Sequence, residues 1–166
     1  MERGNVYDSG VVGITGKPYR SAFFGYGPRN VVNFDNSSYF WSINQPNQSL
    51  TFDFKERRVA LSAYALATGD KDCHLTSWAL EGSNDGANWI VIDEHHNDSV
   101  LWEARRGLFE LQRPPVPYRF IRLRQIHSAF KRGVTGDFWG YGPHVLYLSG
   151  FEIFGSVYPP IFSSME

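Results

Sequence analysis

Residues 77–89 read SWALEGSNDGANW, an apolar run that leads into a glycine-containing turn. An Asp-Gly pair between two apolar runs is a strong β-hairpin signal, because glycine readily takes the positive φ that a tight turn needs. Asp85 and Gly86 form that pair, and a second apolar run begins at Trp89. The segment therefore predicts two neighbouring antiparallel strands, joined by a turn with a structural role and no catalytic one.

Short segments in which apolar and polar residues alternate recur along the rest of the chain. Leu50, Phe52 and Phe54 share one face of such a segment, and Val59, Leu61, Ala63 and Ala65 share one face of the next. Further segments follow at 76–80, 89–92, 107–111, 118–126 and 145–154. A period of two is that of a half-buried strand, and apolar residues show no sustained helical spacing. The pattern predicts an all-β chain built as an antiparallel sandwich or barrel.

Two of these segments carry more detailed predictions. In residues 118–126, Ile121 and Leu123 alternate with Arg122 and Arg124, so one face of the strand must accommodate guanidinium groups. In residues 145–154 both faces are apolar, which is typical of a strand near the middle of a sheet.

Length and charge limit the number of domains and the kinds of partner. The chain has 166 residues, 42% of them hydrophobic, which fits one domain with a substantial core. Its net charge of −1 lacks the global positive field on which sequence-independent nucleic-acid binding relies. No apolar run reaches the roughly 18 residues of a membrane span, and residues 1–10 lack the features of a signal peptide. Neither nucleic acid nor membrane is therefore expected as a partner.

Cysteine usage indicates the compartment. Cys73 is the only cysteine, so the chain makes no internal disulfide, whereas loop-rich secreted domains of this size usually carry pairs. A reducing, cytoplasmic location is expected. Asn36, Asn47 and Asn97 each begin an Asn-x-Ser tripeptide, which would matter for glycosylation only in an exported protein.

Three segments together resemble the discoidin family, also called coagulation-factor C-type, of the galactose-binding-like superfamily. They are residues 77–89, the run Tyr118-Arg119-Phe120-Ile121-Arg122-Leu123, and the run Leu148-Ser149-Gly150-Phe151-Glu152-Ile153-Phe154-Gly155. The resemblance covers residues 30–155. It implies a jelly-roll sandwich of eight core strands that binds ligands with loops at one end, without catalysis. One domain is expected over residues 1–155, followed by a tail over residues 156–166.

Departures from the family pattern narrow what the resemblance implies. Extracellular members clamp their two ends with a disulfide, which a lone Cys73 cannot provide. Sugar-binding members often hold calcium with a Glu of the last strand, whereas Gly150 takes that position here and Glu152 is out of register. No calcium or other cofactor is therefore expected. The chain is more similar to intracellular discoidin-like domains found with BTB, kelch or ubiquitin-ligase modules, which implies a recognition part of a larger scaffold or ubiquitin-ligase component. As an isolated domain it is expected to be monomeric.

A ligand site is predicted where one unusual pattern occurs twice. Residues 23–28 read FFGYGP and residues 138–143 read FWGYGP. Glycine lets a backbone approach a partner closely, and Tyr and Trp offer wide, rigid contact surfaces at small entropic cost. Both loops are expected to meet at one end of the sandwich, as an aromatic cleft with a basic rim for an extended acidic or polar segment of a partner protein. The predicted ligand-binding residues are Arg20, Tyr26, Arg29, Lys131, Arg132, Phe138, Trp139 and Tyr141. The alternative is that these aromatic side chains fold inward as a small core beneath the loops.

Other residue clusters allow competing hypotheses. His95 and His96 lie beside three carboxylates, but neighbouring strand residues point to opposite faces and do not converge on a metal. Cys73-His74 combines a thiol with a base but lacks an oxyanion-stabilising motif, so Cys73 is interpreted as a small apolar filler. A lectin-like, carbohydrate-binding module is the second hypothesis, because aromatic platforms suit sugar rings. An enzyme is the third, since no acid, base and nucleophile converge.

Overall fold

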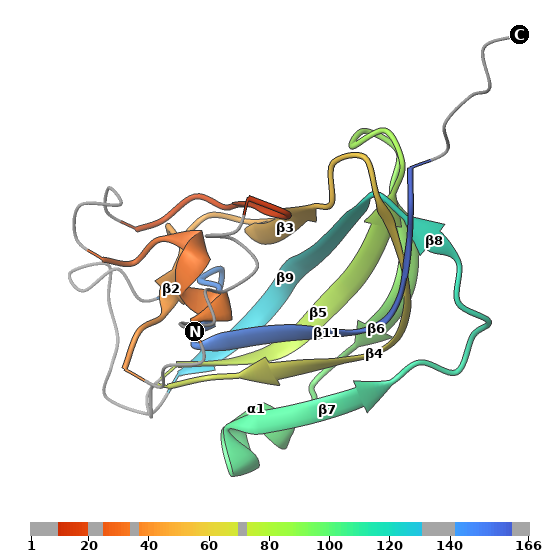
Figure 1. The fold of residues 1–166 in the computed structure, drawn as a ribbon. Coiled ribbons are helices and arrows are strands. Elements are labelled where there is room, and N and C mark those ends of the chain that lie inside the picture. The colour runs from red at the N-terminus through yellow and green to blue at the C-terminus, as the bar shows by residue number, and fades with distance from the viewer. Residues whose placement is uncertain (1–9, 20–24, 34–36, 70–72, 131–141, 161–166) are drawn as a thin grey trace, which may run out of the picture.

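The computed structural model describes residues 10–19, 25–33, 37–69, 73–130 and 142–160 of the chain. In these ranges the chain forms two antiparallel sheets that face each other as a sandwich (Figure 1). The strands are β1 (Gly13–Thr15), β2 (Phe40–Trp41), β3 (Ser49–Asp53), β4 (Arg58–Ala67), β5 (Cys73–Ser83), β6 (Ile90–His95), β7 (Arg106–Glu110), β8 (Pro117–Tyr118), β9 (Phe120–Phe130), β10 (Tyr147–Leu148) and β11 (Gly150–Tyr158). Two short helices accompany them, the 3-10 helix η2 (Pro28–Val32) and the α-helix α1 (Val100–Ala104).

The strand order defines the two layers. One sheet runs β1-β3-β9-β5-β6, and the other runs β11-β4-β7 with β8 also paired to β4. A small ladder joins β10 to β2. The pairings between these strands are antiparallel. The predicted class, an antiparallel jelly-roll β-sandwich, is confirmed.

The core lies between the two sheets. Apolar side chains from alternate positions of both sheets fill it, and those fully buried include Leu50, Trp78, Leu80, Ile121 and Leu123 on one side and Tyr64, Leu66 and Phe151 on the other. Trp78 also donates its indole N–H to the Tyr64 hydroxyl at 2.9 Å, which links β5 to β4 across the interior. A buried indole and phenol need such partners, because an unpaired polar group in the core is costly.

Because of a bulge in β4, the residues of that strand that face the core differ from the prediction. Val59 and Leu61 are buried as expected, but Ala63 and Ala65 are not core residues; Tyr64 and Leu66 take their place. The register explains the change, because Phe154 pairs with Ala63 while Gly155 pairs with Leu61, and Ser62 is the extra residue. One inserted residue reverses the side-chain alternation beyond it.

Residues 145–154 also differ from their prediction as one strand in the middle of a sheet. Both residues of β10 are buried, and its partner is β2. After Ser149 the chain continues as β11, which is an edge strand of its sheet, with Phe154 42% exposed. The apolar run therefore serves two separate ladders. The last strand also continues to Tyr158, three residues beyond the expected domain boundary at residue 155.

The arginine-bearing face of β9 is accommodated as predicted. Glu81 of β5 accepts a hydrogen bond from Arg122 Nε at 2.7 Å and another from Arg124 Nε at 3.0 Å. The Glu81 side chain is only 6% exposed, and the Arg122 guanidinium also lies 3.8 Å from the centroid of the Trp89 ring. A single buried carboxylate therefore pairs with two neighbouring cations on the outer face of the sheet.

The predicted hairpin turn between β5 and β6 is confirmed. Gly86 has a φ of +74°, and its N–H donates to Ser83 Oγ at 2.9 Å. The Asp85 carboxylate accepts the backbone N–H groups of Asn88 and Ala87, each at 2.8 Å. These hydrogen bonds, led by that from Asn88, hold the pKa of Asp85 well below its usual range. The carboxylate is committed to the turn, which fits a structural role.

Candidate binding site

The long connections of the sandwich leave the sheets at one end. Residues 16–48 join β1 to β3, and the segment after β9 departs from the position where Phe130 pairs with Cys73, the first residue of β5. The tight turns between β3 and β4 and between β5 and β6 lie at the opposite end (Figure 1). We call the described residues of 16–48 and 142–149 the loop end.

A cluster of aromatic rings surrounds the β2–β10 ladder at the loop end. Trp41 of β2 stacks on Tyr19 with 5.1 Å between ring centroids and meets the edge of Tyr26 at 5.3 Å. Tyr39 stacks on Tyr26 at 6.1 Å and contacts Tyr147 at 5.0 Å. Tyr147 is buried, whereas the other four rings are half-buried. We call these five residues the aromatic cluster. The buried Tyr147 ring supports the other four rings, whose faces are partly accessible.

A buried amide fixes the first loop against the aromatic cluster. Asn30, in η2, is 8% exposed, and its side-chain amide donates to the carbonyl oxygens of Gly25 and Tyr39, the latter at 2.9 Å. The Trp41 N–H donates to the Tyr26 carbonyl at 3.5 Å. Since buried hydrogen bonds of this kind rigidify a loop, Tyr26 is held in place before any ligand arrives.

The end of the second loop is fixed beside the same ladder. The Pro143 carbonyl accepts the Ser128 N–H at 3.1 Å and the Gln125 side-chain amide at 2.7 Å. The His144 N–H donates to Asn44 Oδ1 at 3.3 Å, and a Cβ at Gly142 would overlap the Asn44 side chain. The described ends of the two loops thus border the one segment that runs from Tyr39 to Asn44.

The structure describes two of the eight predicted ligand-binding residues. Tyr26 is half-buried within the aromatic cluster, and Arg29 is exposed on η2. The other six lie outside the described residues: Arg20, Lys131, Arg132, Phe138, Trp139 and Tyr141. Their participation stays a prediction.

The other members of the aromatic cluster were not among the ligand-binding residues predicted from the sequence. Trp41 and Tyr39 lie two residues apart on an extended segment, which places them on one face, and this spacing was a usable signal. Tyr147 gave no such signal, because its partner ladder with β2 spans more than a hundred positions of sequence and only the fold reveals it.

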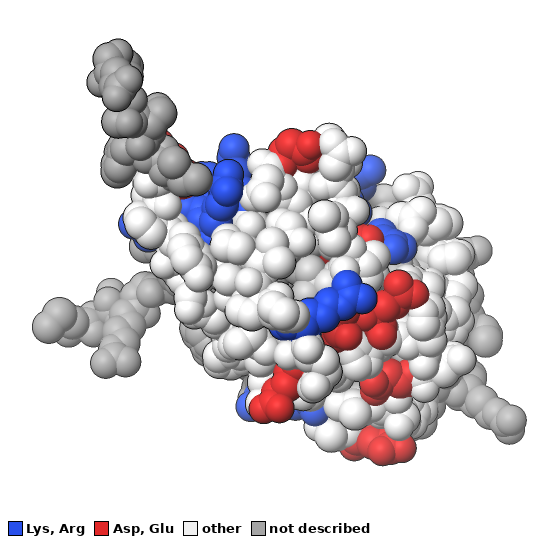
Figure 2. Space-filling view, turned by 90° about the vertical axis from the view of Figure 1, so that its right-hand side faces the viewer, with Lys and Arg blue, Asp and Glu red and all other residues white. Residues whose placement is uncertain are grey.

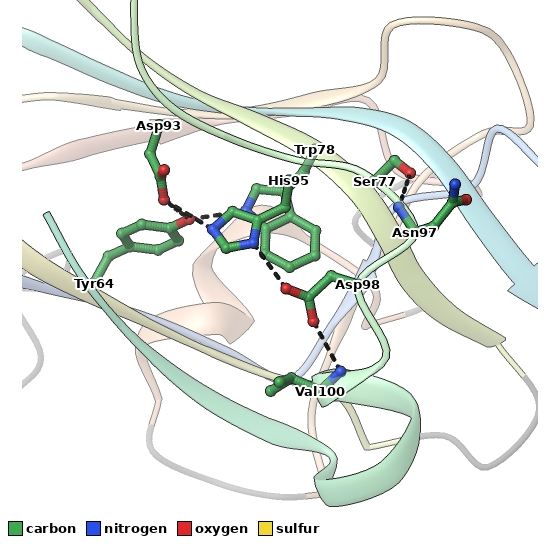
Figure 3. A network of polar contacts seen from close by, with 8 residues as sticks. All are labelled: Tyr64, Ser77, Trp78, Asp93, His95, Asn97, Asp98 and Val100. Atoms are coloured by element: carbon green, nitrogen blue, oxygen red, sulfur yellow. Dashed lines mark hydrogen bonds and ion pairs between the residues drawn. The ribbon is translucent and has the colours of Figure 1, made fainter. Parts of the chain in front are cut away.

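His95, at the end of β6, belongs to a different kind of cluster, drawn in Figure 3. His95 Nδ1 lies 2.8 Å from Asp98 Oδ2, and its Nε2 lies 3.0 Å from Asp93 Oδ2. The ring stacks on Trp78 at 4.4 Å, and Tyr64 donates its hydroxyl to the same Asp93 oxygen at 2.8 Å. Both ring nitrogens are thereby occupied by carboxylates. Within the described ranges no group of three or more His, Cys, Asp or Glu side chains could hold a metal ion.

Burial raises the pKa of Tyr64 far above its usual value, with the neighbouring Asp93 acting in the same direction. The phenol therefore stays protonated as a donor at any physiological pH. The histidine and aspartate cluster joins β4, β5 and β6 to the turn before α1, and this is a structural role.

Cys73 and His74 are both inaccessible. Cys73 is fully buried against Val145 and Tyr147, beneath the aromatic cluster, and its carbonyl accepts the Thr68 hydroxyl at 3.4 Å. His74 is 2% exposed and meets the edge of the Trp102 ring at 4.6 Å. A thiol and an imidazole in these positions cannot reach a substrate, which agrees with the interpretation of Cys73 as an apolar filler.

A jelly-roll sandwich with a loop end lined by half-buried aromatic rings defines a class of protein, the β-sandwich binding modules. The family follows from the sequence: the model of the F5/8 type C domain matches residues 19–135, so the chain belongs to that family, and the discoidin resemblance is confirmed. Domains of this family are binding modules and are not catalytic in themselves. Among the described residues no helix is long and apolar enough to cross a bilayer.

One curated relative is an E3 ubiquitin-protein ligase, Ufd4 of Drosophila melanogaster. The two sequences are 35% identical over 102 residues, which is 58% of this chain and 3% of the relative. The chain therefore spans only a small part of that protein's length.

Several solved structures share the fold. CpGH89CBM32-6, produced by Clostridium perfringens, superposes with a TM-score of 0.63 at 14% identity. The aligned region covers 92% of this chain and 100% of the CpGH89CBM32-6 chain. CpGH89CBM32-5 of the same organism, solved in complex with GalNAc-β-1,3-galactose, has a TM-score of 0.63 at 12% identity with the same coverage. The CBM32 of AlyQ, in complex with 4,5-unsaturated mannuronic acid, has a TM-score of 0.62 at 13% identity. The aligned region covers 88% of this chain and 96% of the AlyQ chain. At such identities the similarity shows the fold alone.

Proposed function

We propose that this chain is a non-catalytic recognition module whose loop end binds an extended segment of a partner protein, as part of a larger ubiquitin-ligase component or scaffold. The observation that carries the proposal is the aromatic cluster, four of whose rings are half-buried around a ladder that both loops border. Rigid, partly exposed Tyr and Trp rings are the side chains most often found at the energetic centre of protein interfaces.

Charge supports an acidic or polar ligand. Arg29 and Lys17 are exposed at the loop end, and the predicted site adds Arg20, Lys131 and Arg132 from the two loops. Guanidinium groups beside aromatic faces bind carboxylates with paired donors, and these contacts add direction to a mainly aromatic interface. The similarity to the Ufd4 ligase supports a protein as the partner and a cytoplasmic setting.

A carbohydrate ligand is the second candidate. Two of the structures with the same fold were solved with sugars bound, GalNAc-β-1,3-galactose and 4,5-unsaturated mannuronic acid. The half-buried rings of Tyr19 and Trp41 offer flat faces of the kind that stack on sugar rings.

Catalysis is the least supported function of this chain. Cys73 and His74 are buried, and the nitrogens of His95 are occupied. Turnover on a panel of hydrolase substrates, abolished by substitution at His74 or His127, would contradict the non-catalytic proposal.

The experiment compares two variants of the whole chain. Trp139→Ala/Tyr141→Ala removes two predicted contact rings, and Val157→Ser is the matched control at the other end, where Val157 is 61% exposed. The unmodified chain and both variants are used as bait for affinity purification with quantitative mass spectrometry, and all three are applied to a glycan array.

We expect the partner proteins of the unmodified chain to be reduced at least about tenfold with the double variant, equivalent to about 1.4 kcal/mol, and to be unchanged with Val157→Ser. Equal recovery with all three baits would contradict the placement of the site. A glycan that binds the unmodified chain and not the double variant, without any such protein, would favour the carbohydrate alternative.

A further inference from the structure

We propose that the proline segment, residues 113–117 with the sequence RPPVP, is a docking segment for a protein module that binds polyproline helices in an aromatic groove. Residues 113–116 connect β7 to β8, Pro117 is the first residue of β8, and the segment lies at the end opposite the loop end. The proposal is independent of the ligand of the loop end.

The amino-acid sequence of the segment imposes its conformation. Pro114, Pro115 and Pro117 each fix φ near −65°, and a residue that precedes proline is pushed out of the helical region. Three of the five residues precede a proline: Arg113, Pro114 and Val116. In the structure, residues 113–116 belong to no helix or strand, and the described residues contain no cis peptide bond. Both restraints together favour a left-handed polyproline helix, with three residues per turn, over residues 113–116, while Pro117 pairs with Ala60 in β8.

The segment is accessible. Residues 112–116 are all exposed, and Val116 exposes 52% of its surface. Figure 1 shows the connection between β7 and β8 bowing outward from the two sheets at the right of the molecule. Figure 2 looks onto this side, where uncharged residues surround several basic and acidic side chains. An aromatic groove can therefore approach the exposed residues of the segment.

Both ends of the segment are anchored. On one side the Leu111 N–H donates to the Ser62 carbonyl at 2.9 Å, and Arg113 Nη1 donates to the Val91 carbonyl at 3.4 Å. On the other side Tyr118 is 8% exposed and packs directly on Gly82 of β5. Because fixed ends and three prolines leave little freedom to lose, binding this segment costs less ordering entropy than binding a free peptide.

The surroundings of the segment are apolar as well. A hollow of about 220 Å³ lies between the segment and β6, lined by Ile90, Val91, Leu111, Pro115 and Val116 among others. Ile90 is 58% exposed and Val91 is 38% exposed. Exposed apolar side chains gathered at one place mark interaction surfaces, and these two can receive the rim of a partner's groove.

Prolines at the edge of a sheet have a second known role, which the test must distinguish from recognition by a partner. They block the addition of a foreign strand, because they lack the N–H that a ladder requires. That role needs no partner, whereas recognition by tryptophan and tyrosine rings does.

The test titrates the isotope-labelled whole chain with a set of purified WW and SH3 domains that bind proline-rich peptides, and follows backbone amide NMR signals. We expect at least one domain to shift the signals of Gln112, Arg113, Val116 and Tyr118, while the signals of the loop end stay in place. Pro114→Ala/Pro115→Ala should weaken that binding at least about tenfold. Val157→Ser, an exposed substitution outside the segment, should leave it unchanged.

A synthetic peptide of residues 110–119 completes the experiment. A domain that binds the peptide but not the intact chain would overturn the proposal, because the segment would then be unavailable in the fold. Failure of every domain to bind either form would overturn it as well and leave strand blocking as the role of the prolines. Arg113→Glu/Val116→Asp, which keeps all three prolines, should also lose binding; if it binds as the unmodified chain does, contact with the segment is excluded.

Discussion

Gly82 of β5 has no room for a methyl group. A Cβ on its backbone would overlap the ring of Tyr118, which is itself buried where β8 joins the sheet. Gly82→Ala should therefore lower the free energy of unfolding by about 1–3 kcal/mol, the usual cost of overpacking a core, as measured by urea denaturation.

Gly13→Ala in β1 is the control for Gly82→Ala. The nearest atom to a Cβ at Gly13 is 3.8 Å away, so this substitution should change stability by less than about 0.5 kcal/mol. Equal midpoints for the two variants would mean that the Tyr118 ring moves aside at little cost.

Asp53 predicts a dependence of stability on pH. Arg119 donates to both of its carboxylate oxygens, at 2.9 and 3.0 Å, and this pair is the main reason that the pKa of Asp53 lies below its ordinary value. A carboxyl group whose pKa is lowered by folding stabilises the fold above its unfolded pKa, and this contribution is lost as the pH falls through its folded pKa. Asp53→Asn should therefore be less stable than the unmodified chain at pH 7, and the gap should close as the pH falls below about 4.

The Asp53 effect is measured as thermal midpoints across an acid pH series. It should be modest, since both partners are partly exposed to water. Glu56→Gln in the adjacent turn is the control, because Glu56 is exposed and takes part in no ion pair within the described ranges. A gap for Asp53→Asn that is constant with pH would contradict the assignment.

The candidate site was only partly predictable from individual residues. Tyr26 and Arg29 were selected because a repeated glycine-aromatic pattern contains or borders them, and the structure describes both at the loop end. Asn30 was missed, although its buried amide holds the first loop, because one Asn in a polar stretch looks like any turn residue. Such a role depends on which carbonyl groups the fold brings near it.

At the level of elements, one carboxylate links the side chains of two neighbouring strands. Glu81 of β5 is 4% exposed and pairs with Arg122 and Arg124 of β9. Glu81→Gln should lower the free energy of unfolding by about 3 kcal/mol, because it leaves two half-buried cations without their counter-charge. Urea denaturation measures the change.

Glu94→Gln on the neighbouring β6 is the matched control for Glu81→Gln. The Glu94 side chain is 40% exposed and contacts only His96 among the described ion pairs. Its loss should change stability by less than about 1 kcal/mol. If both substitutions cost the same, the burial of Glu81 contributes nothing.

The start of α1 depends on Asp98 rather than on the formal N-cap. Asp98 Oδ1 accepts the Val100 N–H at 2.8 Å, whereas Ser99 makes no side-chain cap hydrogen bond. Asp98→Ala should cost about 1 kcal/mol or more, since it also removes the contact with His95, and should speed amide hydrogen exchange in α1. Ser99→Ala should leave both quantities unchanged; a larger effect at Ser99 would reverse the assignment.

The strands were largely predictable because alternation is a local property, whereas their breaks were not. The hairpin at Asp85 and the arginine face of β9 follow from neighbouring residues alone. The bulge at Ser62 depends on how β11 pairs with β4, and the division of residues 145–154 depends on β2 lying next to β10. Helix α1 was not predicted either, since five residues are too few to display a helical period.

For the whole molecule, the interior predicts one cooperative unfolding transition. The two sheets share a single main core, and Trp78 bridges them through its hydrogen bond to Tyr64. Tryptophan fluorescence and far-ultraviolet circular dichroism should therefore give the same midpoint in a urea titration. Two separated transitions would show that the sheets unfold independently.

The positions of Gly10 and Tyr158, near the two ends of the described chain, affect how the domain can be attached to a surface or to another protein. Lys55 donates a hydrogen bond from its ammonium group to the Gly10 carbonyl, and Tyr158 pairs with Arg58, so Gly10 and Tyr158 both lie beside the turn between β3 and β4. That turn is on the pole remote from the aromatic cluster. A tether attached at Gly10 or at Tyr158 would therefore hold the described unit by this pole, and a sensor surface coupled at either position should leave the aromatic cluster open to the solution.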